Sequence, residues 1–175
     1  MASILKFDVW QGSNGVVKPI VLQTKSTSYV TTYGNSSGSP VDVSGFSVSI
    51  TPSSVNSKIL VMVTCFMGGD NDTYGYIVLK RNGTVVGSGE SPSGVTGTFA
   101  GTYMTNLGGT TTYTMRNVSN SYMDSPATTS AITYQIAMAS PYGGSSYINR
   151  QATQISSASY TQQPSSSITV MEIAG

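Results

Sequence analysis

The side chains that could carry out chemistry in this sequence are few. Seven carboxylates and eight Lys or Arg residues are spread over 175 positions, and there is no histidine. Without histidine, Ser–His–Asp and Cys–His nucleophilic sites and the usual general base near neutral pH are excluded. Glycoside hydrolysis requires two carboxylates held ~5–10 Å apart, and only Asp70 and Asp72 lie close together in the sequence. We therefore expect no catalytic residue, no cofactor and no enzymatic activity.

Asp70 and Asp72 belong to the stretch GGDNDTYG, for which two interpretations are open. Closely spaced carboxylate and amide oxygens suit a hard cation such as Ca²⁺. The stretch is not followed by the bidentate Glu of an EF-hand loop, however, and a solvated β-turn explains the same residues. The sequence favours the turn and predicts no metal site, with Asp70 and Asp72 kept as weak candidate ligands.

The 11 tyrosines are the second group of interest. An exposed phenol ring can stack on a sugar, while its hydroxyl takes part in hydrogen bonds. The alternative is that tyrosine fills strand faces and places its hydroxyl at the wet edge or in a subunit interface. Tyr74, Tyr142 and Tyr147 are the candidates for contact with a glycan or a protein partner.

The elements that must position these residues are strands. Large side chains recur at every second position between Ile132 and Met138, which is the period of a strand with one buried and one exposed face. Apolar residues do not keep a 3.6-residue period over three turns anywhere, so we expect no helix. Asn82-Gly83 between β-rich segments predicts a two-residue type I′ hairpin, because both residues tolerate positive φ.

Other segments predict further strands. The nearly continuous apolar run Lys58–Met67 is typical of a central strand covered on both faces. Tyr113–Arg116 and Tyr122-Met123 predict two separate short segments. Pro19 restricts the residues that follow it to an edge strand or an extended arm. In all we expect eight to eleven short strands with turn signals between them.

This pattern predicts an all-β protein, a jelly-roll-like antiparallel β-sandwich of two sheets packed about 10 Å apart. A small barrel is the main alternative. We expect residues 1–25 to form a short extended N-terminal arm or a first strand, and residues 26–175 to form the sandwich domain.

Composition and charge exclude several classes of partner. The net charge is +1 and charged residues make up 9% of the chain, against a typical share of about 25%. Nucleic acid is an unsuitable partner because backbone phosphates require clustered Lys and Arg. No apolar run reaches the ~20 residues of a membrane-spanning helix, so we expect no membrane role. Cys65, inside the apolar stretch LVMVTCFM, is expected to be a buried, inert thiol.

Several segments together carry a resemblance to a known group of proteins. In chain order they are GFSVSITPSSVNSKILVMV, LKRNGT, YTMRNVSNSYMDSPATTSAITYQIAMAS, SYINR and the terminal SSITVMEIAG. They resemble small virion structural proteins and C-terminal fibre domains of tailed bacteriophages, particularly those infecting marine bacteria and cyanobacteria. The resemblance implies a non-enzymatic β-domain at the virion surface, made in the host cytoplasm and assembled as a homotrimer.

Two functions follow from this resemblance. The first is a head-decoration (cement) protein that clamps neighbouring subunits of the major capsid protein and stabilises the capsid mechanically. The alternative is a tail-fibre or receptor-binding tip whose loops, residues 68–73, 87–97 and 141–146, face a host surface glycan. A lectin-like or C1q-like binding module is a third possibility on fold alone, because a fold does not specify a function.

Overall fold

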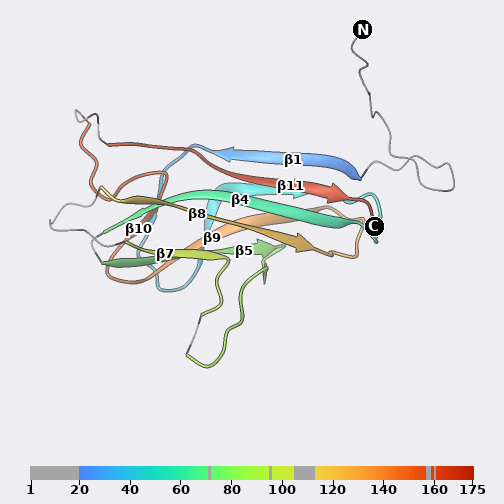
Figure 1. Ribbon diagram of the computed structural model, residues 1–175, viewed down its shortest axis with the longest axis horizontal. Helices are drawn as coiled ribbons and strands as arrows, with labels where there is room; N and C mark the ends of the chain where they lie inside the picture. Colours follow the sequence, from blue (N-terminus) through green and yellow to red (C-terminus); the bar gives the residue numbers. More distant parts are fainter. Residues whose placement is uncertain (1–19, 71, 95, 105–112, 157–158, 160) are drawn as a thin grey trace, which may run out of the picture.

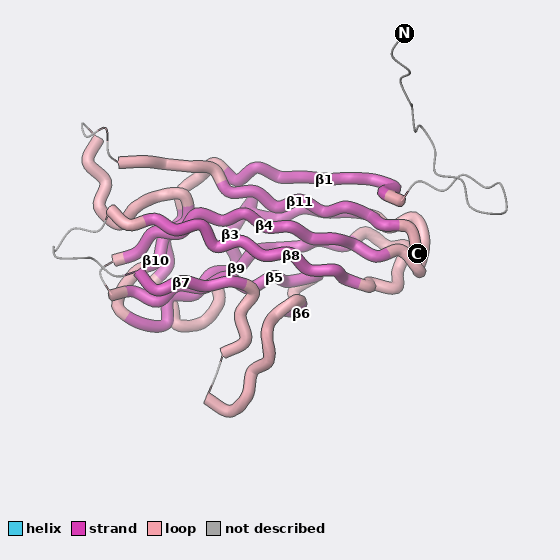
Figure 2. The backbone as a smooth tube through the Cα atoms, viewed as in Figure 1, coloured by secondary structure: helices cyan, strands magenta, loops and turns pink. Residues whose placement is uncertain are grey.

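Strands and loops make up the described part of the chain, as Figure 2 shows. The computed structural model describes residues 20–70, 72–94, 96–104, 113–156, 159 and 161–175. Eleven strands and no helix lie within these residues, at the upper end of the predicted number. In chain order they are β1 (Val21–Tyr29), β2 (Tyr33–Asn35), β3 (Val41–Ile50), β4 (Lys58–Gly69), β5 (Thr73–Arg81), β6 (Thr84–Val86), β7 (Ala100–Met104), β8 (Met115–Asp124), β9 (Ile132–Tyr142), β10 (Ser146–Ile148) and β11 (Ser166–Ile173). Among the described residues, therefore, none belongs to a helix that is long and apolar enough to cross a membrane.

The strands form two antiparallel sheets that pack face to face (Figure 1). The six-stranded sheet has the order β1-β11-β4-β10-β2, with β8 paired to β4. The five-stranded sheet has the order β3-β9-β5-β6, with β7 paired to β5. Neighbours such as β1 and β11 are far apart in the sequence. The predicted jelly-roll-like sandwich is confirmed, in place of the small barrel.

The core lies between the two sheets and is built by alternation of side chains. Every second residue of β11, from Ser166 to Glu172, is buried. The rings of Tyr29 in β1 and Phe46 in β3 stack with their centroids 4.9 Å apart, and this contact joins the sheets. Because full burial of one such apolar side chain contributes roughly 1.5–3 kcal/mol, the shared core accounts for the packing of the two layers.

A buried polar contact also joins the sheets. Nη1 of Arg81 in β5 donates to both carboxylate oxygens of Asp124 in β8, each at 2.8 Å. The hydroxyl of Tyr134 in β9 donates to Oδ2 of the same carboxylate at 2.6 Å. Burial raises the pKa of the Tyr134 hydroxyl, and the Asp124 carboxylate raises it further. A buried carboxylate is tolerated only where such partners compensate for its lost hydration, so each member of the contact depends on the others.

The predicted Asn82-Gly83 hairpin is confirmed. The two residues have φ values of 48° and 85°, and Arg81 pairs with Thr84 across the turn. Positive φ at both central positions is the requirement of a type I′ turn, and Asn and Gly meet it at little cost.

β4 is central, as predicted, but the prediction that both of its faces are covered is wrong. Its inward residues are buried, whereas the outward residues Leu60, Met62 and Phe66 are only partly buried. The strand covered on both faces is β5, in which residues 76–79 are all buried and alternate between the main core and a second, smaller cluster. An apolar run shows that a strand is central, but only the tertiary structure shows whether a second layer covers it.

The two short segments predicted at Tyr113–Arg116 and Tyr122-Met123 are wrong, because one strand, β8, spans most of both. It pairs with β4 without interruption, from Met115 opposite Gly68 to Asp124 opposite Ile59. The Asn and Ser residues between the two segments have low intrinsic strand preference, but pairing with a central strand overrides this preference.

The N-terminal prediction is partly outside the described residues. The expected arm or first strand covers residues 1–25, of which residues 1–19 are not described and residues 21–25 belong to β1. β1 pairs with β11 at one edge of the six-stranded sheet, so the edge strand predicted after Pro19 is confirmed.

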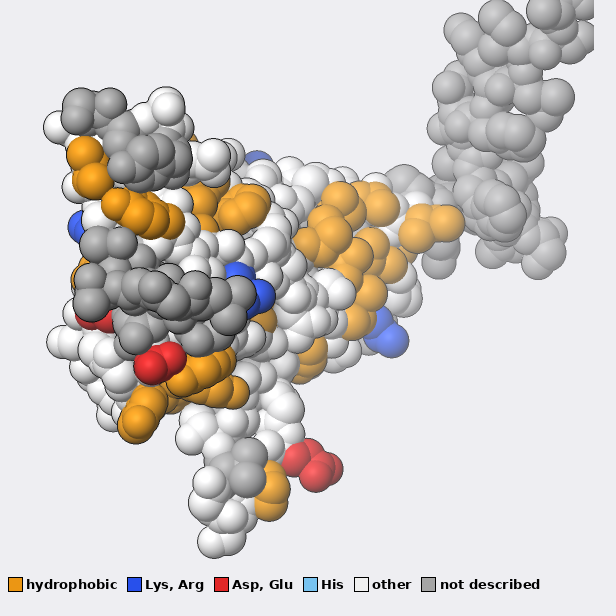
Figure 3. Space-filling model, turned by 60° about the vertical axis from the view of Figure 1, so that its left-hand side comes forward, with side chains coloured by type: hydrophobic (Ala, Val, Ile, Leu, Met, Phe, Trp, Pro, Cys, Tyr) orange, Lys and Arg blue, Asp and Glu red, His pale blue; other side chains and the backbone are white. Residues whose placement is uncertain are grey.

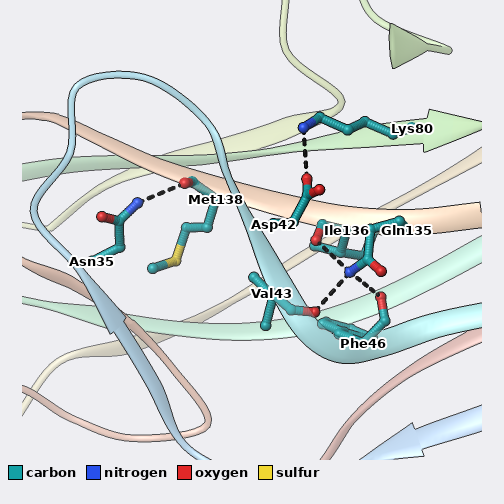
Figure 4. Close-up of polar contacts among 8 residues, drawn as sticks. All are labelled: Asn35, Asp42, Val43, Phe46, Lys80, Gln135, Ile136 and Met138. Atoms are coloured by element: carbon teal, nitrogen blue, oxygen red, sulfur yellow. Dashed lines mark hydrogen bonds and ion pairs between the residues drawn. The ribbon is translucent and has the colours of Figure 1, made fainter. Parts of the chain in front are cut away.

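A bulge in the β3–β9 pairing is filled by a single side chain (Figure 4). The register shifts just after Asp42. Nε2 of Gln135 donates to the carbonyl oxygens of Val43 and Phe46 at 2.7 and 3.2 Å. Beside it, Nζ of Lys80 contacts Oδ1 of Asp42 at 2.6 Å. Side-chain hydrogen bonds thus take the place of ladder bonds where the strand bends.

Candidate binding surfaces

The outer face of the six-stranded sheet presents apolar side chains at one end. Met171 of β11, Leu60 of β4 and Met123 of β8 occupy directly opposed positions on three neighbouring strands. Opposed residues of antiparallel strands project to the same side, and Val21 and Ile173 form a further pair next to them. These five residues are called the apolar face below. Figure 3 shows apolar side chains gathered on this side of the molecule, close to the point at which the described chain begins.

The apolar face has the composition of a protein-binding surface. Met123 and Val21 are 46% and 44% exposed, and the other three residues are partly buried. Single exposed apolar side chains are normal, whereas a contiguous group marks an interaction site. Methionine is enriched in interfaces because its flexible thioether adapts to the opposing surface. Exposed methionine beside other apolar side chains is thus the feature that makes this face a candidate interface.

The loops around the two aspartates singled out from the sequence pack against the β9–β10 turn. Oδ2 of Asp70 accepts a hydrogen bond from the Ser145 N–H at 2.7 Å, and its Oδ1 accepts one from the Tyr147 hydroxyl at 3.2 Å. Oδ1 of Asp72 accepts one from the Tyr103 hydroxyl at 3.1 Å. Each carboxylate thus holds a neighbouring segment in place. In the part of the chain that is described, no three His, Cys, Asp or Glu side chains come together as metal ligands.

Three tyrosines form a row across the five-stranded sheet, called the tyrosine row below. Tyr74 of β5 pairs with Tyr103 of β7 on one side and with Tyr142 of β9 on the other. The residues are 48%, 44% and 67% exposed, in that order. The rings of Tyr74 and Tyr103 lie 5.9 Å apart and are inclined by 39°. The structure thus brings together two of the predicted contact residues, Tyr74 and Tyr142, and adds Tyr103 to them.

Tyr147 lies apart from the tyrosine row, in β10 of the six-stranded sheet. The guanidinium carbon of Arg150 lies 4.4 Å from the centroid of its ring. Gly34 packs so closely against the same ring that a Cβ there would approach it to 3.0 Å. Tyr147 therefore contributes to packing at this end of the molecule, and its contact with a glycan or partner stays a prediction.

A groove of about 400 Å³ opens beside the tyrosine row. The described residues that line it are Tyr74 and Tyr76 of β5, Gly101 of β7, Pro141 of β9, and Gly94, Thr96 and Thr98 of the β6–β7 connection. This connection projects from the body of the sandwich in Figure 1. Gly101 lies directly opposite Tyr76, and a Cβ at position 101 would approach the Tyr76 Cβ to 3.0 Å. A side chain at position 101 would therefore crowd Tyr76, which lines the groove.

Sequence reasoning named the loops at this groove but missed part of its lining. Residues 87–97 and 141–146 were expected near a ligand, and the groove draws Gly94, Thr96 and Pro141 from them. Of the lining residues, Thr98 was not singled out. Tyr103, which belongs to the tyrosine row but does not line the groove, was not singled out either. Its position follows from the pairing of β7 with β5, and no local pattern distinguishes it from the other tyrosines.

Cys65 is fully buried in β4, as predicted. Burial raises the pKa of its thiol to about 12, and a hydrogen bond with Ser166 opposes this shift only in part. Because the thiolate is the reactive form, this cysteine is chemically inert at neutral pH.

The chain was also compared with known proteins. No protein-family model matches it, and no curated protein matches its sequence. A chain in the structure of infectious bursal disease virus Gt strain is similar with a TM-score of 0.37 and 10% identity, over 99% of this chain and 43% of that chain. A chain in the structure of the Gx strain has the same TM-score and identity, over 99% and 41% of the two chains. This chain thus spans less than half the length of either of these two chains.

Proposed function

We propose that this protein is a non-enzymatic structural protein of a virion surface, and specifically a head-decoration (cement) protein of a tailed bacteriophage. It assembles as a homotrimer, and its further partner is the major capsid protein. The observation that carries this proposal is the apolar face, which favours contact with another protein. The resemblance of the sequence to virion proteins supplies the biological setting.

The apolar face suits a permanent assembly. Interfaces of permanent complexes are more apolar than the rest of a protein surface, and removing apolar area from water contributes roughly 25 cal/mol per Å². A trimer forms when a heterologous interface closes on itself. The apolar face of one copy, around Leu60 and Met123, therefore packs against a different surface of the next copy.

The carboxylates support a mechanical rather than a catalytic role. In addition to Asp70 and Asp72, three others hold the scaffold: Asp42 contacts Lys80, Asp124 contacts Arg81, and Glu172 binds the β3–β4 loop. A general acid or base must be free to exchange a proton with a substrate. Groups engaged in the scaffold instead make it rigid.

Glu172 shows this engagement in most detail. Its Oε1 accepts hydrogen bonds from the N–H and the hydroxyl of Ser53 at 2.7 and 2.6 Å, and its Oε2 accepts one from Nε2 of Gln23 at 2.6 Å. Burial alone would raise the pKa of this carboxyl, but the hydrogen bonds outweigh it and hold the pKa at about 2. The carboxylate therefore ties β1 and the β3–β4 loop to β11.

In this role the protein acts by mass action. A trimer that binds only the mature, intact shell shifts the equilibrium between intact and disassembled particles towards the intact one. The contribution per trimer depends on its affinity for the shell, and it adds over all occupied positions.

The test is binding of the purified protein to expanded capsids that lack it, followed by imaging of the particle. We expect saturable binding with a fixed number of copies per capsid, at positions of local threefold symmetry. Absence of saturable binding, or a position at the tail alone, would contradict the decoration role. Turnover of any substrate that is lost on changing one carboxylate would contradict the non-enzymatic role.

A second candidate function, a tail-fibre or receptor-binding tip, is favoured by the tyrosine row and its groove. Exposed rings beside a groove are suited to a small ligand such as a host surface glycan. If the protein is a receptor-binding tip, an excess of it should block attachment of the phage to host cells. An unchanged rate of attachment would contradict this candidate.

A further inference from the structure

We propose that the groove beside the tyrosine row is a binding site for a neutral saccharide. Tyr74 supplies the stacking ring, and Thr96 and Thr98 supply the hydroxyls. This inference deepens the second candidate function and rests on it for its biological purpose, since it names the site, its residues and the class of sugar. It is compatible with the decoration role.

The ring arrangement is the first support. Tyr74 lines the groove and is 48% exposed, so part of its side chain is accessible to a ligand. Tyr76, 5% exposed, forms part of the lining from within the second buried cluster and is therefore held in place. The apolar C–H face of a pyranose ring packs against an aromatic ring, as other apolar groups do. Tyr74 thus offers the surface on which one sugar ring can lie.

The polar lining is the second support. The β6–β7 connection contributes Thr96 and Thr98 to the lining of the groove. Each hydroxyl is both a donor and an acceptor of hydrogen bonds, which matches the donor and acceptor character of sugar hydroxyls. Ligand sites usually combine apolar walls with a few such polar groups, in pockets of ~300–1,000 Å³. The groove, at about 400 Å³, has room for a small saccharide.

Charge decides the class of sugar. The described residues that line the groove carry no formal charge. Outside this lining, the Tyr103 hydroxyl donates a hydrogen bond to the carboxylate of Asp72, and the ring of Tyr103 lies 5.9 Å from that of Tyr74. A neighbouring carboxylate, with no cation in the described lining to offset it, disfavours an anionic ligand. The site therefore favours hexoses and N-acetylhexosamines over sialic or uronic acids.

Gly101 has a defined part in this site. It lies opposite Tyr76, lines the groove and contributes no side chain to it. The residue also pairs within β7, where glycine is otherwise unfavourable. A glycine inside a strand often marks a bulge, a bend, or a position at which a ligand or another backbone approaches closely, and the place of Gly101 in the groove lining fits the approach of a ligand.

The experiment is a titration of the full chain, labelled for NMR, with maltotriose, lactose, chitotriose and sialyllactose. We expect at least one neutral sugar to bind with a millimolar Kd and to shift the resonances of Tyr74, Thr98 and Gly101. Tyr74→Ala should weaken this binding by about tenfold, whereas Tyr74→Phe should stay within about threefold because the ring is retained. Val85→Ala is the matched control, since Val85 is 46% exposed, lies in β6 and does not line the groove. It should bind like the wild type.

Three outcomes would overturn the inference. These are no shift with any neutral sugar at tens of millimolar, shifts that map away from the groove, or equal binding by Tyr74→Ala and the wild type. Tighter binding of sialyllactose than of every neutral sugar would overturn the assignment to neutral sugars. The spectra of each variant show whether it is folded. Sugar binding without any effect on host attachment would contradict only the second candidate function, and failure of sugar binding would leave the decoration role intact.

Discussion

The two outer faces of the sandwich present different side chains. On the six-stranded sheet, Leu60, Met123 and Met171 line up over three strands as an apolar face. On the five-stranded sheet, the corresponding side of β5 carries Tyr74 beside a groove and Tyr76 in a second buried cluster. Along the strands of each sheet, residues of the outer face alternate with residues that point into the shared core. They differ because the β6–β7 connection borders a groove on the five-stranded sheet.

This difference determines what each face can recognise. A groove with walls and a few polar groups can enclose a small ligand and discriminate by hydrogen bonding. An apolar face without such groups contributes binding energy in proportion to its buried area, so it favours a protein partner. Under the two proposals, one side of the sandwich serves assembly and the other contacts a ligand.

The largest effect is expected at the buried contact of Asp124 with Arg81 and Tyr134, which joins the two sheets. Asp124→Ala leaves the guanidinium of Arg81 and the hydroxyl of Tyr134 without their common acceptor, which should lower the free energy of unfolding by about 3–5 kcal/mol. Urea denaturation measures this change. Asp42→Ala is the control, because Asp42 is 57% exposed in its ion pair with Lys80 and an exposed pair contributes about 1 kcal/mol or less. Equal losses in the two variants would show that the sheets do not depend on Asp124.

The next effect concerns the six-stranded sheet and depends on pH. Glu172→Gln should lower the free energy of unfolding by about 1–3 kcal/mol at pH 7, because charge-assisted hydrogen bonds are lost. In the folded protein the pKa of Glu172 is about 2, below its value of about 4.3 in an unfolded chain. Its contribution is therefore fully present above about pH 5 and is lost as the pH falls towards 2.

The measurement is the melting temperature of the wild type and of Glu172→Gln between pH 7 and pH 2. The difference between them should shrink as the solution becomes more acidic. Glu90→Gln, at an exposed carboxylate, is the control and should follow the wild type throughout. A difference that stays constant over the whole range would mean that the Glu172 carboxylate is not the group that titrates.

The third effect separates assembly from stability at the apolar face. Met123→Asp should weaken self-association by at least about tenfold, because a charge must be desolvated in the interface. The free energy of unfolding should change by no more than about 0.5 kcal/mol, since the side chain is exposed. Val85→Asp, at the same exposure of 46%, should assemble normally. Sedimentation measures the mass of the assembly. If Met123→Asp assembled like the wild type, the apolar face would not be part of the interface.

The smallest effect is expected at the tyrosine row. Tyr103→Phe loses the hydrogen bond to Asp72 and should lower the free energy of unfolding by about 1 kcal/mol or less. Affinity for a neutral sugar should fall less than threefold, in contrast to Tyr74→Ala, because Tyr103 does not line the groove. A loss of sugar affinity as large as that of Tyr74→Ala would show that the sugar contacts Tyr103 as closely as it contacts Tyr74.

Much of the fold could be predicted because its signals are local. Alternation from Ile132 to Met138 gave β9, Asn82-Gly83 gave the hairpin, and the apolar run after Lys58 gave a central strand. Each signal depends on side-chain period or on backbone φ, which neighbouring residues determine by themselves. The middle of β8 was not predicted to be a strand, because its Asn and Ser residues do not favour one and its pairing with β4 does.

The candidate surfaces depend on contacts between distant residues. The sequence by itself determined that the protein is all-β with little ionisable chemistry, and it singled out Tyr74, Tyr142 and Tyr147. Only the tertiary structure decided that the strands form a sandwich rather than a barrel, that Tyr103 joins Tyr74 and Tyr142, and that Met123 lies beside Leu60. The physical reason is that strand register brings these residues together, and register is set by the packing of the whole core rather than by any one segment.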